Sequence, residues 1–295
     1  MNNKQNSRFL VYLIIAQILV PIAFGVSSAL ASCENEDSYV DQSLVFAIDI
    51  STSIEEDEAE LQLRAYETAL REQSVQDKLL GCGCTELSVV LFAGESTVVV
   101  EPTKIIDEED IFAVLGFFSD TINTQYTERY LSEYFQLPGD TSVLAGLQTS
   151  MDILLQEENT AFRRAILMSG DGVNSTFKER ELLAIQEQSE YQGIEISGVP
   201  ITSRSDLNLC AAYETDHAEA PGVGGACSRE PSLSTNGLFS LEQSQSRGQE
   251  YGSVTEFYEE FVTNRFGIIN TAANFQELAG VLTETIDEFA CKPMM

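Results

Sequence analysis

The chain has 295 residues, of which 43% are hydrophobic and 21% charged, which is sufficient for one large α/β domain or two small ones with a sizeable core. Its 16 lysines and arginines stand against 47 aspartates and glutamates, which gives a formal net charge of −31. We therefore exclude nucleic acid as a partner, because binding to phosphates requires a basic surface, and we interpret the acidity as a source of solubility.

The N-terminal segment has the pattern of an export signal. Lys4 and Arg8 precede a mostly apolar run, and Ala29-Leu30-Ala31 then offers a cleavage site. The apolar run is shorter than the roughly 20 residues that a membrane-spanning helix requires. We predict a signal peptide over residues 1–31 and a mature domain over residues 32–295, either periplasmic or secreted.

Strand and helix patterns alternate along the mature chain. Continuous apolar runs predict strands, and apolar residues repeating every three or four positions predict helices. In chain order, these patterns predict a strand at 43–48, a helix at 54–73, a hairpin of strands at 87–93 and 97–101, helices at 107–121 and 144–154, a strand at 164–168, a helix at 177–191, a strand at 194–201, a helix at 254–262, a strand at 266–269 and a last helix from Phe275 to Phe289. This alternation predicts a doubly wound α/β fold, with a mainly parallel sheet and helices on both faces.

One long polar stretch interrupts the alternation. Residues at about 202–250 are rich in Ser, Gly, Gln and Glu and include two cysteines and His217, the only histidine. We interpret this stretch as an insertion on the rim of the domain, and His217 as a solvated loop residue without a catalytic role.

The six cysteines bear on the fate of the mature N-terminus. Leu30-Ala31-Ser32-Cys33 resembles a bacterial lipobox, in which the cysteine is lipidated and anchors the protein to a membrane. An even number of cysteines in an exported chain favours disulfides instead, and lipidation of Cys33 would leave an odd thiol. We favour the soluble form, with Cys33–Cys291 joining the ends of the domain and Cys210–Cys227 closing a loop in the insertion.

The two remaining cysteines are close neighbours in the sequence. Cys82-Gly83-Cys84 allows either a strained redox-active bridge or a local structural link. We favour the structural link, because the segment lacks the C-x-x-C spacing that is typical of redox and zinc sites.

Oxygen-bearing side chains follow two of the predicted strands and precede one helix. Asp49, Ser51 and Ser53 follow the first strand, Thr141 precedes the helix at 144–154, and Asp171 follows the strand at 164–168. Ligands of open α/β sheets bind outside the carboxyl ends of the strands. Two carboxylates and three hydroxyls form an all-oxygen set that suits Mg²⁺, Mn²⁺ or Ca²⁺ and not zinc or copper.

Each of these residues also has a simpler structural interpretation. Ser53 with Glu56 fits a helix capping box, and Thr141 fits an N-cap. Asp49 and Asp171 fit ordinary acidic residues at strand ends. The occurrence of all three segments together favours the metal site.

The three segments resemble the metal-ion-dependent adhesion site of von Willebrand factor type A domains, and the wider pattern resembles a bacterial exported family with this fold and no established function. The stretches that carry the resemblance are FAIDISTSIEEDEAELQLRAYETAL, AILMSGDGVNS and GIEISGVPI. The resemblance covers residues 42–290, roughly, and departs at Pro138-Gly139-Asp140, where the family more often has paired glycines.

The resemblance implies a role for each site residue. Ser51 and Ser53 would coordinate the ion through their hydroxyls, and Thr141 would bind it directly or through water. Asp49 and Asp171 would act mainly through metal-bound waters. The remaining position would take an Asp or Glu carboxylate from a partner protein.

Three functions are compatible with this sequence. The first, which we favour, is a non-enzymatic binding module that holds a divalent cation, preferably Mg²⁺. The second is a metal-dependent hydrolase or an accessory subunit of an enzyme complex, and the third is a structural domain with a vestigial site. No general base other than the acids of the site is visible in the sequence, which argues against catalysis.

Overall fold

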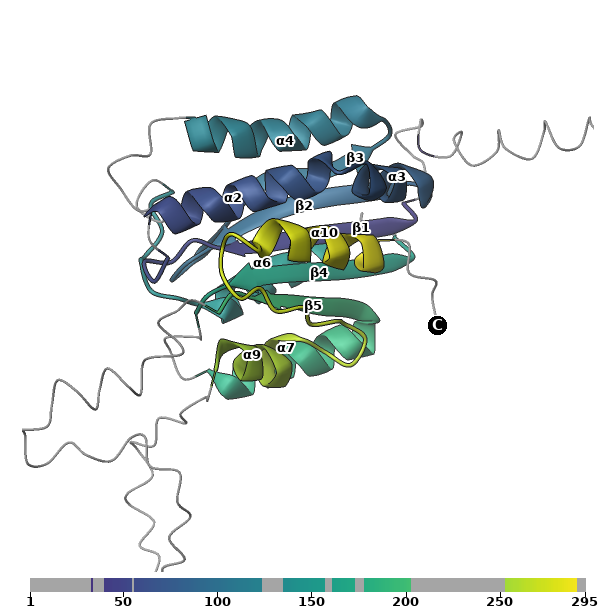
Figure 1. Cartoon of the computed structure of the whole chain (residues 1–295). Coiled ribbons are helices and arrows are strands. Elements are labelled where there is room, and N and C mark those ends of the chain that lie inside the picture. The colour runs from purple at the N-terminus through teal and green to yellow at the C-terminus, as the bar shows by residue number, and fades with distance from the viewer. Residues whose placement is uncertain are drawn as a thin grey trace, which may run out of the picture.

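A single five-stranded sheet forms the centre of the molecule (Figure 1). The computed structural model describes residues 33, 40–54, 56–123, 135–156, 161–172, 178–202 and 253–290. The strand order is β3-β2-β1-β4-β5. The strands are β1 (Gln42–Asp49), β2 (Thr85–Phe92), β3 (Ser96–Ile105), β4 (Arg163–Gly170) and β5 (Ile194–Pro200).

All strands except the edge strand β3 run parallel to one another. β1 pairs in parallel with β2 and with β4, β4 pairs in parallel with β5, and β3 returns antiparallel to β2 as the second arm of a hairpin. The central strand β1 is buried along its whole length. The carboxyl ends of β1 and β4 therefore lie side by side at one edge of the sheet, where the predicted site residues are found.

Helices cover both faces of the sheet. Along β1, Leu44, Phe46 and Ile48 belong to one hydrophobic core and Val45 and Ala47 to the other, because successive side chains of a strand point to opposite faces. The first core includes residues of α2 (Glu56–Arg71), α3 (Gln73–Gly81), α4 (Glu108–Asn123) and α10 (Leu278–Phe289). The second includes residues of α6 (Val143–Leu154), α7 (Glu179–Gln192), α9 (Val254–Phe257) and the π-helix η1 (Tyr258–Val262). The predicted doubly wound fold is confirmed.

Two predicted helices differ in detail from the observed ones. The helix expected at 54–73 stops at Arg71, because Glu72 has extended backbone angles (φ −65°, ψ 130°), and a second helix, α3, follows directly. The helix expected at 254–262 is α-helical for only four residues and continues as η1. The apolar spacing places the buried faces correctly in both segments, but it does not reveal where the backbone hydrogen bonds change.

The prediction of a sixth strand at 266–269 is wrong. This segment forms one isolated parallel bridge to the edge strand β5, at Gly198–Ile269, and a second isolated bridge, Ile201–Ala272, lies just beyond both segments. Asn264 is the reason, because its Oδ1 accepts hydrogen bonds from the backbone of both Phe266 and Gly267, at 3.2 Å each. The N–H groups of Phe266 and Gly267 therefore donate to the Asn264 side chain and are not available for pairing with a neighbouring strand.

The predicted Cys33–Cys291 disulfide is also wrong, because Cys33 pairs with Cys84. Cys84 precedes β2 and lies beside the start of β1, where its carbonyl accepts from the backbone N–H groups of Asp41 and Gln42 at 2.8 and 3.1 Å. Cys84 therefore lies beside the residues at which β1 begins, within bonding reach of Cys33. Cys82 is disulfide-bonded as well, to a cysteine outside the described residues, so Cys82 and Cys84 do not bridge each other.

We expect the partner of Cys82 to be Cys291. Cys82 is the C-cap residue of α3, and an ion pair of 4.0 Å between Lys78 Nζ and Asp287 Oδ1 joins α3 to α10, whose last residue lies two positions before Cys291. Peptide mapping of the unreduced protein by mass spectrometry should yield a Cys82–Cys291 peptide, and the predicted Cys210–Cys227 pair would account for the remaining cysteines. A Cys82 peptide joined to either cysteine of the insertion would contradict this prediction.

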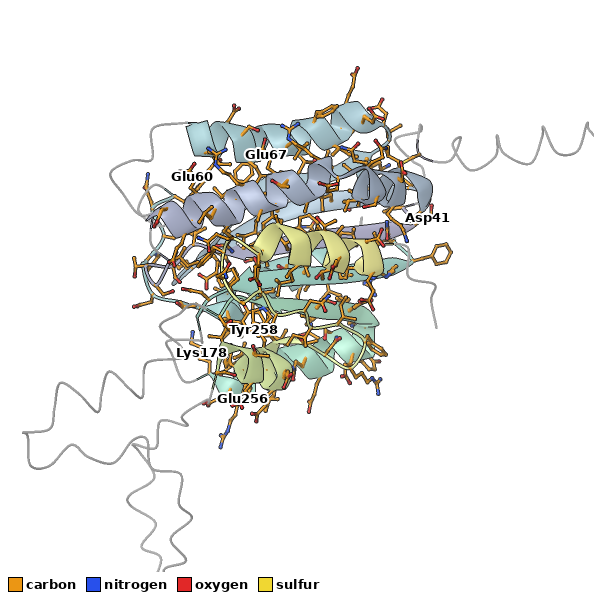
Figure 2. All side chains as sticks on the ribbon, in the orientation of Figure 1. Asp41, Glu60, Glu67, Lys178, Glu256 and Tyr258 are labelled. Carbon is orange, nitrogen blue, oxygen red and sulfur yellow. A yellow bond between two sulfur atoms is a disulfide. The ribbon has the colours of Figure 1, made fainter. Side chains whose placement is uncertain are left out.

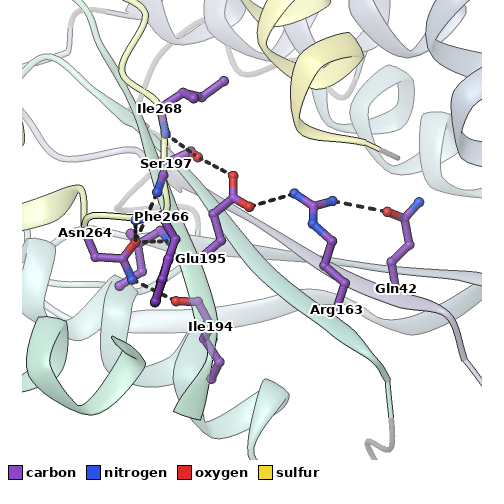
Figure 3. A network of polar contacts seen from close by, with 10 residues as sticks. Gln42, Arg163, Ile194, Glu195, Ser197, Asn264, Phe266 and Ile268 are labelled. Atoms are coloured by element: carbon purple, nitrogen blue, oxygen red, sulfur yellow. Dashed lines mark hydrogen bonds and ion pairs between the residues drawn. The ribbon is translucent and has the colours of Figure 1, made fainter. Parts of the chain in front are cut away.

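A buried polar network ties the sheet together at the edge opposite the predicted site (Figure 3). Arg163 Nη2 forms an ion pair with Glu195 Oε2 at 2.9 Å, and Arg163 Nη1 donates to Gln42 Oε1 at 3.3 Å. Glu195 also accepts from Ser197 Oγ at 3.3 Å, and Ser197 Oγ accepts from Ile268 N at 3.0 Å. The network therefore joins β1, β4 and β5 to the segment that precedes α10.

Among the described residues, no helix has both the length and the apolar character needed to cross a membrane. The predicted signal peptide (1–31) and most of the predicted insertion, including His217, Cys210 and Cys227, lie outside the described residues.

Candidate functional site

Three loops meet at the carboxyl ends of β1 and β4. Asp49 is the last residue of β1, and Asp171 directly follows β4. The two strands are neighbours in parallel register, with Ile48 opposite Ser169. The third loop brings in Thr141, which lies two residues before α6.

The loop after β1 folds back on the strand that it leaves. The backbone N–H of Ser51 donates to Asp49 Oδ1 at 2.9 Å, and the N–H of Ile54 donates to the carbonyl of Ser51 at 3.1 Å. Asp49 and Ser51 are almost completely buried, whereas Ser53 is exposed. The Asp-x-Ser-x-Ser spacing thus forms a turn that runs from the buried strand end to the surface.

A continuous chain of hydrogen bonds connects four of the predicted residues. Thr141 Oγ1 donates to Ser51 Oγ at 2.8 Å, Ser51 Oγ and Ser53 Oγ are 3.0 Å apart, and Ser53 Oγ donates to Asp171 Oδ1 at 2.8 Å. Asp49 joins the chain through the backbone of Ser51. The structure therefore brings all five predicted residues together, although they span more than 120 positions in the sequence.

The alternative interpretation of Thr141 as a helix cap is wrong. The N-cap of α6 is Ser142, whose side chain accepts from the N–H of Ala145 at 3.3 Å. The Thr141 hydroxyl instead donates to Ser51 Oγ. The hydroxyl of Ser53 is likewise directed to Asp171.

Sequence reasoning missed two residues that hold the loops together. The N–H and the hydroxyl of Thr52 both donate to the carbonyl of Gly139, each at 2.9 Å. A Cβ at Gly139 would lie 2.6 Å from Thr52 Cγ2, so only glycine permits this contact. Pro138-Gly139-Asp140 thus has a glycine where the two loops touch.

The floor of the site contains a third missed residue, Tyr258 of η1. Gly170 separates it from Asp49: a Cβ at Gly170 would lie 2.7 Å from Asp49 Oδ2 and 2.9 Å from the Tyr258 hydroxyl. Neither Asp49 Oδ2 nor the Tyr258 hydroxyl has a hydrogen-bond partner among the described residues, and both atoms are buried. Nothing in the local sequence around Tyr258 indicates this proximity.

Burial dominates the electrostatics of the site. The pKa of Asp49 is raised from 3.8 to about 7, mainly by loss of hydration and also by the negative charge of Asp171, while the hydrogen bonds from Ser51 oppose both effects. Burial also raises the pKa of Tyr258, with contributions from Asp49, Tyr66 and Asp171. A positive charge at the site would reverse the effect on Asp49, because opposite charges favour the ionised carboxylate.

The residues present fit a hard divalent cation. The donors are all oxygens, which such ions prefer, and the buried Asp49 Oδ2 has an unused acceptor position. Gly172 lies close beside two of the donors. A Cβ at this position would lie 3.2 Å from Thr141 Oγ1 and 3.5 Å from Ser53 Oγ, so a larger residue would crowd these hydroxyls. In the part of the chain that the structure describes, no group of three or more His, Cys, Asp or Glu side chains is arranged to hold a metal ion, and this site itself has only two carboxylates.

Comparison with known proteins shows one family and several similar folds. A family model described as "Protein of unknown function (DUF1194)" matches residues 39–223. No curated protein matches the chain.

The solved structures similar to this chain include von Willebrand factor A domains. Proximal thread matrix protein 1 from the mussel byssus, with a zinc-occupied MIDAS motif, is 13% identical, with a TM-score of 0.48 over 86% of this chain and 48% of that chain. BatB from Bacteroides thetaiotaomicron is 14% identical, with a TM-score of 0.46 over 85% and 99% of the two chains. The von Willebrand factor type A protein from Catenulispora acidiphila is 12% identical, with a TM-score of 0.46 over 85% and 43%. The present chain spans about half the length of the mussel protein.

Proposed function

The chain belongs to the family described as "Protein of unknown function (DUF1194)", and we propose that it is a non-enzymatic binding module that holds a divalent cation, preferably Mg²⁺, and binds a carboxylate of a partner protein through that ion. Asp49, Ser51, Ser53, Thr141 and Asp171 would hold the ion. The ion would supply a positive centre for an oxygen ligand from outside the chain.

The observation that carries this proposal is the connected set of oxygens around a buried carboxylate. An unpaired buried acceptor such as Asp49 Oδ2 costs free energy unless something satisfies it. A cation would favour the ionised form of Asp49, whose pKa burial raises. With only two carboxylates in the set, a bound divalent ion would remain electrophilic and would attract a further anionic ligand.

A carboxylate ligand also explains how so acidic a protein can select an acidic partner. The chain carries a formal net charge of −31, so long-range electrostatics repel an acidic surface. An ion held at the strand ends would offer a local attraction for the carboxylate. We therefore expect the interaction to depend on the cation rather than on general charge.

Export of the protein is part of the proposal. The segment 1–31 has the features of a signal peptide, and disulfides are typical of exported proteins. The Cys33–Cys84 bond uses the thiol that lipidation would modify, which supports a periplasmic or secreted protein without a lipid anchor.

Calorimetric titration of the processed protein with Mg²⁺ and Mn²⁺ tests the ion site. We expect saturable binding to the native protein and roughly a 10- to 100-fold loss of affinity in Asp49→Ala, in line with the removal of a group that orients metal ligands. Asp152→Ala is the matched control, because Asp152 is an exposed acid on α6 and its removal changes the net charge equally. Equal losses in both variants, or no binding to the native protein, would contradict the proposal.

Two further measurements separate a binding module from an enzyme. Saturation-transfer NMR on the methyl group of acetate should detect binding of this carboxylate probe to the Mg²⁺-loaded protein but not to the protein in EDTA. Turnover of a nitrophenyl phosphate or ester by the Mg²⁺-loaded protein, lost in Asp49→Ala, would instead support a hydrolase.

A further inference from the structure

Tyr258, labelled in Figure 2, is completely buried. Tyr258 is the first residue of η1, on the face of the sheet that carries α7 and α9. Its ring lies against Gly198 of β5, where a Cβ would be 2.7 Å from Tyr258 Cδ1, and its hydroxyl lies against Gly170 of β4. Glycines inside strands often mark a close approach of other groups. Here the two glycines leave space for one tyrosine to reach the end of β1.

The hydroxyl of Tyr258 differs from that of the other fully buried tyrosine nearby. Tyr66 donates to Ser169 Oγ at 2.8 Å. The Tyr258 hydroxyl has no partner among the described residues, and the same is true of Asp49 Oδ2. Both unpaired atoms lie within 3 Å of the point that a Gly170 Cβ would occupy. The Tyr258 hydroxyl, which can donate a hydrogen bond, and Asp49 Oδ2, which can accept one, are thus buried close to each other.

The backbone around Tyr258 is held firmly in place. Its carbonyl accepts from the N–H of Thr263 at 2.8 Å, and Gln186 of α7 donates to the carbonyls of Glu260 and Thr263 at 3.2 and 3.0 Å. Short π-helical turns of this kind are frequent at functional sites. The position of the hydroxyl is therefore set by η1 and α7, and not by the loops that carry the site residues.

We propose that Tyr258 is a positioning residue of the ion site, whose hydroxyl donates to Asp49 Oδ2 when the ion is bound. This inference rests on the proposed function. Ser51 N already holds Asp49 Oδ1, so a second bond at Oδ2 would fix the rotation of the carboxylate. Outer-shell hydrogen bonds of this kind orient the groups that hold a metal, and their loss commonly weakens metal binding 10- to 100-fold.

Tyr258→Phe tests the inference, with Tyr66→Phe as the matched control. We expect Tyr258→Phe to weaken Mg²⁺ binding at least about tenfold in calorimetry, while the midpoint of urea unfolding in EDTA stays the same or rises, because the removed hydroxyl has no bond to lose. We expect the reverse in Tyr66→Phe: a lower urea midpoint, because the bond to Ser169 is lost, and Mg²⁺ affinity within about twofold of native.

The outcomes distinguish this inference from the function on which it rests. If the native protein binds Mg²⁺ and Tyr258→Phe binds it equally well, the positioning role is overturned and the ion site stands. If Tyr258→Phe lowers affinity only together with the urea midpoint in EDTA, the residue is structural and the inference fails. If the native protein binds no divalent ion, the proposed function and the inference both fail.

Discussion

In EDTA, the free energy of unfolding should fall by up to about 4 kcal/mol between pH 4 and pH 8 on account of Asp49 alone. The native carboxyl has a pKa of about 7, against 3.8 as the ordinary value. Within this interval the native state retains a proton that the unfolded state has lost. Stability decreases with rising pH wherever the native state binds more protons, so the stabilisation from protonated Asp49 is complete near pH 4 and is lost as pH passes 7.

Asp49→Asn isolates this contribution, because the amide is uncharged at every pH. Urea unfolding in EDTA at several pH values should show a steeper decline for the native protein than for Asp49→Asn, with Asp49→Asn the more stable at pH 8. Asp152→Asn, at an exposed position, should follow the native curve. Parallel curves for the native protein and Asp49→Asn would show that Asp49 is ionised in the folded protein without a metal. Saturating Mg²⁺ should flatten the native curve, because the ion stabilises the charged carboxylate.

Asn264→Ala should lower the free energy of unfolding by roughly 3 to 5 kcal/mol. The buried Asn264 amide, labelled in Figure 3, forms five hydrogen bonds. Its Oδ1 accepts from Ile196 N, Phe266 N and Gly267 N, and its Nδ2 donates to Ser189 Oγ and Ile194 O. Alanine would remove all five hydrogen bonds at once, and each buried partner left unpaired costs about 1 to 3 kcal/mol.

Asn274→Ala is the matched control for this second prediction. Asn274 Oδ1 accepts from Glu277 N at 3.0 Å in the turn before α10, and this hydrogen bond is exposed, so that water can replace the amide. Urea unfolding should show a loss of about 1 kcal/mol for this variant, as for an ordinary helix cap. Comparable losses in the two variants would mean that the Asn264 network contributes no more than a surface contact.

The apolar runs in the sequence were sufficient to predict most of the sheet. β1, β4 and β5 each contain a buried run of mostly apolar residues, and such runs have few alternatives in a parallel sheet. The segment 266–269 looked the same in sequence but forms no strand, because hydrogen bonds to Asn264 divert its backbone. A local pattern does not reveal competition from a side chain that tertiary packing brings into place.

The site was predictable where its residues carry a recognisable spacing. Asp49, Ser51 and Ser53 lie on one turn, and Asp171 follows a strand end, so both segments were assigned to the same edge of the sheet. Their role as ligands of a cation remains a prediction. Tyr258 was not predictable, because its proximity to Asp49 depends on the glycines of two other strands.

The sequence by itself determined the alternation of strands and helices and the edge of the sheet at which polar oxygens gather, because burial and turn chemistry act over a few neighbouring residues. Tertiary structure alone decided the pairing of Cys33 with Cys84, the direction of the Thr141 hydroxyl toward Ser51 and the approach of Tyr258 to Asp49. Each of these features is a contact between segments that are distant in the sequence. Such contacts depend on the packing of the whole domain, and the residues next to each partner in the sequence do not indicate them.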